Sequence, residues 1–259
     1  MNQQLVVGFP KPGRALKVVL LVVFAVWLFF AAGIHWGGAD RAVFGLFVGS
    51  DAILSGELWR LFTTFLVHQP VGNGATGHLI TTMLGLYFLG SSLEESWGGR
   101  RFVLFLLGAG LFGAAFQVLL GALVPQLHAQ EFYGGLGVVD AVAVAWAMSF
   151  RDRQVRLFFV LPVTGKGLLA IVVVMNVLFV IAGELHREGL VTPFGGMLAG
   201  YLGADGSPLR SAYLRWRFKR LQGQSAALRG VRTSGKPKLS VIQGGQPSGK
   251  GKPDKSMLN

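Results

Sequence analysis

The sequence contains no cysteine, and only 14% of its 259 residues are charged. The absence of cysteine excludes disulfides, thiolate metal sites, cysteine nucleophiles and palmitoylation at cysteine. Soluble globular chains carry roughly a quarter charged residues. So few charges, beside 52% hydrophobic residues and 38 glycines, are typical of helices that lie in lipid and pack closely through small residues.

Acidic residues are especially scarce, 12 against 24 Lys and Arg, which gives a net charge of +12. Residues 205–259 alone hold 12 Lys and Arg against 2 Asp and Glu. Basic segments next to membrane helices mark the cytoplasmic side and attract anionic lipid. Because no nucleic-acid-binding motif accompanies the charge, we expect anionic lipid rather than nucleic acid as the partner of this tail.

Six apolar stretches predict six membrane helices. A spanning helix needs about 20 apolar residues, and the last stretch is short for a full span. The first stretch is longer than the apolar core of a signal peptide and has no sharp small-residue cleavage site after it, so we expect it to be retained. The stretches are residues 18–34, 78–93, 102–124, 137–150, 167–183 and 191–204.

The loops between these stretches predict the topology. With six helices, the basic clusters of residues 11–17, 100–101 and 151–156 and the basic tail all fall on one side. The positive-inside rule then places both termini in the cytoplasm of a cell membrane. We therefore expect a cytoplasmic segment (1–17), a membrane domain (18–204) and a basic tail (205–259) that is disordered from Gly223 onward.

Residues 37–77 are mixed in polarity, and their apolar pieces are too short to span a membrane. We expect interfacial or re-entrant structure here, with Trp59 and Arg60 packing the loop at the membrane interface. Glu94, at the end of the second predicted helix, is expected to cap that helix near Arg100 or Arg101.

Four short motifs follow one another along the chain in an order that is more specific than any one of them. They are Glu57-Leu58-Trp59-Arg60, Gly90-Ser91-Ser92-Leu93-Glu94, Gly134-Gly135-Leu136-Gly137 and Gly195-Gly196-Met197-Leu198-Ala199-Gly200. Each alone is unspecific, but their order over residues 40–204 resembles the rhomboid family. The resemblance implies an all-α, six-helix membrane bundle without a cofactor. Gly137, Gly196 and Gly200 are expected to let helices approach closely.

Active rhomboids, as the resemblance implies, cut membrane helices with a Ser–His dyad, assisted by an Asn that helps to hold the oxyanion. In this sequence Leu136 stands at the serine position, Pro193 at the histidine position and Thr82 at the asparagine position. Leucine cannot act as a nucleophile, and proline has no side-chain acceptor for a proton. We therefore expect no catalytic residues.

Asp140 follows Leu136 by one helical turn and lies on the same helix face. An ionisable residue in a membrane helix is a functional candidate, so Asp140 and His78 are the predicted binding residues. Asp140 could serve as a proton or ion site or meet a client helix; we favour a hydrogen bond to a neighbouring helix through Thr82 or His78. The histidines match no metal-site spacing, and no metal is expected.

Three functions remain open from the sequence. The favoured one is a pseudoprotease that binds transmembrane helices of client proteins. The second is a divergent rhomboid serine protease with an unrecognised catalytic arrangement, and the third is a small transporter or proton-conducting bundle centred on Asp140. Client identity and oligomeric state are not encoded in any recognisable motif.

Overall fold

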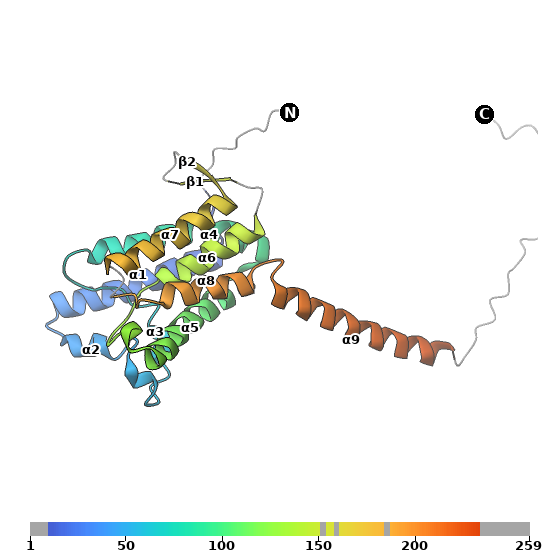
Figure 1. The fold of residues 1–259 in the computed structure, drawn as a ribbon, viewed down its shortest axis with the longest axis horizontal. Coiled ribbons are helices and arrows are strands. Elements are labelled where there is room, and N and C mark those ends of the chain that lie inside the picture. The colour runs from blue at the N-terminus through green and yellow to red at the C-terminus, as the bar shows by residue number, and fades with distance from the viewer. Residues whose placement is uncertain (1–9, 151–153, 158–160, 184–186, 234–259) are drawn as a thin grey trace, which may run out of the picture. The chain divides into compact units, whose positions relative to one another are not determined.

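A computed structural model describes residues 10–150, 154–157, 161–183 and 187–233 (Figure 1). Each of the six predicted stretches is helical. The helices are α1 (Arg14–His35), α4 (Ala75–Trp97), α5 (Gly99–Leu123), α6 (Leu136–Ser149), α7 (Gly165–Ala182) and α8 (Thr192–Gly203). Among the described residues α1, α5 and α7 are long and apolar enough to cross a membrane. The chain forms a helical membrane bundle.

Helix α6 occupies the centre of this bundle, because it packs against α4, α5, α7 and α8. Its sequence is almost wholly valine, alanine and other apolar residues, and a helix that is hydrophobic on all sides is buried. Val142 and Trp146 of α6 join Leu93 of α4 and Phe102 of α5 in the main hydrophobic core. The start of α6 is therefore held in place by several neighbouring helices at once.

Small residues bring α8 against α6. A Cβ atom added at Gly196 would overlap the backbone of Gly137, and one added at Gly200 would overlap the backbone of Ala141. Without side chains at these positions the two backbones touch directly, as small-residue pairs allow in membrane helices. The contact aligns the first turns of α6 and α8, where the predicted site residues lie.

The segment between α1 and α4 forms three short helical pieces, α2 (Arg41–Gly45), η1 (Asp51–Ile53) and α3 (Arg60–Thr63). Arg60 is buried within it. Its guanidinium donates to the carbonyls of Gly45 and Val48, the latter at 2.8 Å, and pairs with Glu57 at 2.6 Å. Trp59 is half exposed, and its indole N–H donates to the Leu46 carbonyl at 3.1 Å. Arg60 thus ties the loop together from inside, while Trp59 covers its surface.

A β-hairpin that the sequence analysis did not predict joins α6 to α7. Its strands, β1 (Gln154–Leu157) and β2 (Leu161–Thr164), pair antiparallel with Gln154 opposite Thr164. Four-residue strands lie at the short end of what sequence patterns reveal. Figure 1 shows this hairpin at one end of the bundle and α2 at the other. A further 3-10 turn, η2 (Pro125–Leu127), follows α5.

The chain divides into two units, residues 1–213 and 214–259, and α9 (Pro208–Thr233) runs from the first into the second. The prediction of disorder from Gly223 onward is wrong for residues 223–233, which are helical. Strong helix formers, Ala226, Ala227 and Leu228 among them, follow Gly223 and offset its cost of about 1 kcal/mol. Residues 234–259 lie outside the described residues.

Candidate functional site

The predicted catalytic positions come together at the first turns of α6 and α8. Leu136 is the first residue of α6, and Pro193 lies fully buried in the first turn of α8. Thr82 of α4 is also buried, and it lies so near Gly135 that a Cβ atom there would meet its methyl group. Its hydroxyl donates to the His78 carbonyl one turn earlier, at 3.3 Å. The site therefore holds a hydrocarbon side chain and a proline ring at the positions predicted for the dyad.

Glu188, which the sequence analysis did not single out, reaches into this site. One carboxylate oxygen lies 2.5 Å from Nε2 of His78. The other accepts the backbone N–H of Leu136 at 3.2 Å. The Glu188 side chain is only 9% exposed. A ring N–H from α4 and the first N–H of α6 therefore converge on the same carboxylate.

The hydrogen bonds of His78 fix which ring nitrogen carries the proton. The backbone N–H of Gln69 donates to Nδ1 at 3.3 Å, so Nδ1 is the acceptor. Nε2 then carries the hydrogen and donates to Glu188. The arrangement has the chemistry of an oxyanion site, in which fixed donors face a negatively charged oxygen. Here the chain's own carboxylate is the oxygen ligand.

The backbone of the loop before α6 leaves the space that the Glu188 carboxylate occupies. Gly134 has a φ of +129°, which L side chains rarely adopt, and a Cβ atom there would overlap the carboxylate of Glu188. Its N–H donates to the Thr64 carbonyl, while Tyr133 N–H donates to the Arg187 carbonyl at 2.6 Å. Three loops that are distant in sequence therefore meet at the start of α6.

A second histidine, His68, lies next to His78. The ring centroids of His68 and His78 are 5.0 Å apart, and His68 is fully buried. Burial, with a smaller contribution from His78, lowers the pKa of His68 to about 4. Farther along the chain, His128 pairs with Asp51 at 3.4 Å, and His186 lies outside the described residues.

Asp140 is buried in α6, but its partner differs from the two that the sequence analysis named. The side-chain amide of Asn176, in α7, donates to Asp140 at 2.9 Å and to the Val172 carbonyl at 2.9 Å. The prediction of a bond to Thr82 or His78 is therefore wrong, while a bond to a neighbouring helix is present. Asn176 was detectable as a lone amide in an otherwise apolar helix.

The prediction that Glu94 caps its own helix near Arg100 or Arg101 is wrong. The Glu94 carboxylate accepts the backbone N–H groups of Ala15 at 2.9 Å and Leu16 at 3.1 Å, so it caps α1. Arg101 instead pairs with Asp205 at 3.0 Å. The correction has a physical reason, because the first N–H groups of a helix have no acceptor within the helix and attract negative charge.

Comparisons with known proteins place this geometry in context. Residues 55–205 match the family model described as the Rhomboid domain. The chain is 22% identical over 194 residues to Rhomboid protease GluP of Bacillus subtilis (strain 168). The aligned region covers 74% of the chain and 35% of that relative. The chain is 26% identical over 155 residues to Rhomboid protease GlpG of Salmonella typhi, covering 59% of the chain and 48% of that relative. The chain thus spans less than half the length of these relatives.

Proposed function

We propose a function from the premise that this chain belongs to the rhomboid family of intramembrane proteases. In this proposal the chain keeps the family's membrane bundle but lacks its proteolytic activity, and it binds transmembrane segments of client proteins. The observation that carries the proposal is the Glu188 carboxylate, held by His78 and by the N–H of Leu136. It occupies the donors that an acyl-transfer reaction would need for its oxyanion. Leu136 and Pro193 add neither nucleophile nor base.

Losing both dyad members leaves no Ser–His reaction to accelerate, because such members act as a unit. The glycine contacts between α6 and α8 persist all the same, so the fold around the site is kept without its chemistry. This combination favours a use that depends on the bundle itself. Recognition of other membrane helices is such a use.

Helix α7 is the element best suited to meet a client helix. It packs against α6 and β2, and its outer residues Val174, Leu178 and Ile181 are 54%, 51% and 76% exposed. The Asp140–Asn176 hydrogen bond holds it to α6. Polar bonds of this kind in membrane bundles contribute only about 0.6 kcal/mol on average, so α7 is able to shift when a client arrives.

The absence of proteolysis is tested with the purified full-length chain in micelles and in vesicles. We expect no cleavage of a broad rhomboid substrate and no labelling by a serine-directed fluorophosphonate, with an active rhomboid as the positive control. Clear activity in either assay would falsify the pseudoprotease proposal and favour a divergent protease. The variant His78→Ala then tells whether that activity arises at this site.

Client binding is tested by photo-crosslinking within the membrane. A crosslinking residue placed at Leu178 or Ile181 of α7 should capture co-expressed single-span membrane proteins. The matched control is Leu104 of α5, which is also exposed, at 60%. Equal capture from α5 and α7, or an empty capture from α7, contradicts client binding at this face.

A further inference from the structure

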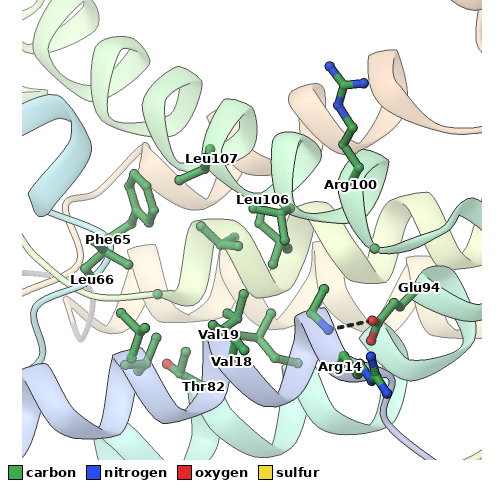
Figure 2. Close-up of a pocket in the computed structure, with 18 residues that line it drawn as sticks. Arg14, Val18, Val19, Phe65, Leu66, Thr82, Glu94, Arg100, Leu106 and Leu107 are labelled. Carbon is green, nitrogen blue, oxygen red and sulfur yellow. Dashed lines mark hydrogen bonds between the residues drawn. The ribbon is translucent and has the colours of Figure 1, made fainter.

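An apolar cavity of about 710 Å³ lies between α1 and α5 (Figure 2). Its floor is built from buried residues of the two helices behind, Leu86 of α4 and Val138 of α6. Its rim carries Val18 and Val22 of α1, which are 59% and 41% exposed. In a membrane bundle a rim of this kind faces lipid. The cavity is therefore open from the bilayer side and closed toward the core.

Positive charge gathers at one end of the cavity. Arg14 begins α1 and Arg100 lies in the first turn of α5, and both line that end. Within the described part of the chain, neither guanidinium forms an ion pair. The N-terminus of α5 adds partial positive charge there. An anion placed at this end would meet three favourable groups.

The single carboxylate at this end does not cancel that charge. Figure 2 shows Glu94 turned toward the backbone of α1, where it accepts the N–H groups of Ala15 and Leu16. Its charge is thus held by the helix terminus, and both arginines remain available. The opposite end of the cavity is apolar, with Phe65 and Leu66 lining it.

We propose that this cavity binds one anionic phospholipid, with an acyl chain between α1 and α5 and the phosphate at the end that Arg14 and Arg100 line. Basic pockets between membrane helices on the cytoplasmic side are suited to anionic headgroups. Charge placement in the sequence assigns this end of the bundle to the cytoplasm. The basic tail begins beside this end of the bundle, since Asp205 pairs with Arg101 at 3.0 Å, but the residues that line the cavity all come from positions 14–138.

The dimensions favour an acyl chain over a client helix. From Arg14 to Val23 the lining of α1 rises about 14 Å at 1.5 Å per residue. An acyl chain is much thinner than a helix of about 10 Å diameter, so it needs less of the open space between α1 and α5. An acyl chain is a single row of methylene groups and fits the space. The inference stands whether or not the protein binds clients.

The test measures lipid binding to the full-length protein by native mass spectrometry after delipidation in a neutral detergent. The probes are phosphatidylglycerol and phosphatidylcholine with the same acyl chains. We expect one tightly held phosphatidylglycerol per chain. The double variant Arg14→Gln/Arg100→Gln should lower the preference for phosphatidylglycerol about fivefold for each arginine lost.

Two matched controls separate this site from the general positive charge. The variant Lys11→Gln/Lys17→Gln removes the same amount of charge, on either side of Arg14, but changes no cavity residue, so the preference should persist. Val22→Trp should fill the cavity and abolish the tight site. Leu21→Trp, on the neighbouring residue that is 65% exposed and outside the cavity, should leave it intact.

Three results would overturn the proposal. The first is equal binding of the two lipids by the unaltered protein. The second is an equal loss in the lysine and arginine variants, which would assign binding to net charge. The third is displacement of phosphatidylglycerol by a single-span hydrophobic peptide that crosslinks to Val22, which would make the cavity a helix-docking site.

Discussion

At the scale of single residues, Glu188 links a loop to two helices that are distant from it in sequence. Its carboxylate accepts from the His78 ring and from the first N–H of α6, and it is almost wholly enclosed. Removing a buried hydrogen-bond acceptor leaves its donors desolvated and unpaired, which costs more than the bond itself contributes. The stability of the site region should therefore depend on this one carboxylate.

We expect Glu188→Ala to lower the free energy of unfolding by about 1–3 kcal/mol, because two donors lose their acceptor. For a chain of this size that is a decrease of roughly 2–12 °C in Tm, measured by thermal unfolding in micelles. Glu131→Ala is the control, since Glu131 is exposed in the loop between α5 and α6. Equal Tm values for the two variants would contradict the role given to Glu188.

The buried ring of His68 predicts a pH dependence. Burial, and to a smaller extent the neighbouring His78, lower the pKa of His68 to about 4. The groups packed around His68 are His78, which is bonded to Glu188, and Thr82. Between pH 4 and 6.5 the unfolded chain binds a proton that the folded chain does not, so stability rises with pH. This contribution to the stability of the fold is complete above pH 6.5 and is lost as the pH falls toward 4. The total is about 3 kcal/mol.

Thermal unfolding from pH 7 to pH 4.5 measures this loss. The unaltered protein should lose most of that stability over the interval, and His68→Gln should show a distinctly flatter profile. His35→Gln, at an exposed position, serves as the control and should follow the unaltered protein. A His68→Gln profile as steep as that of the control would refute the assignment.

At the scale of helices, the α6–α8 contact depends on positions without side chains. We expect Gly196→Ala to destabilise the bundle by at least about 2 kcal/mol, because its methyl group would collide with the backbone of Gly137 rather than with a movable side chain. Gly108→Ala in α5 has open space around it and should be neutral or slightly stabilising. Thermal unfolding of both variants decides; similar Tm values would mean that the contact adapts.

The attachment of α7 to α6 is open to a double-mutant cycle. Asn176→Leu should destabilise by about 1–3 kcal/mol, because it leaves the buried Asp140 without its donor. Asp140→Leu/Asn176→Leu should recover much of that loss, since neither polar group is then left unpaired. If the double variant is as unstable as the sum of the singles, the two residues do not act as a pair.

The helices could be predicted from the sequence, and the pairings between them could not. Long apolar runs are demanded by the bilayer, so α1 and α5 appear within a few residues of their predicted bounds. Glu188 and His68 depend instead on loops that converge only after folding. For the same reason the sequence did not reveal that Glu94 caps α1. Asp140 was identified as important, but its partner on α7 was misassigned.

At the scale of the whole molecule, charge asymmetry predicts the orientation. The loop containing Gly98 and Arg100 carries basic residues, whereas the loop from 125 to 131 has none. Because the chain has no cysteine, single introduced thiols report sidedness cleanly. A membrane-impermeant maleimide should label Gln130→Cys in intact cells and label Ser96→Cys only after lysis. The reverse pattern would invert the proposed topology.

The contact of Glu94 with α1 has a consequence for biosynthesis. Helix α1 leaves the ribosome before α4, yet the acceptor for its leading N–H groups belongs to the last turn of α4. Docking of α1 must therefore wait until α4 has been synthesised and inserted. Until then the leading N–H groups of α1 lack this acceptor, and chains that stall before Glu94 would expose α1 to membrane quality control.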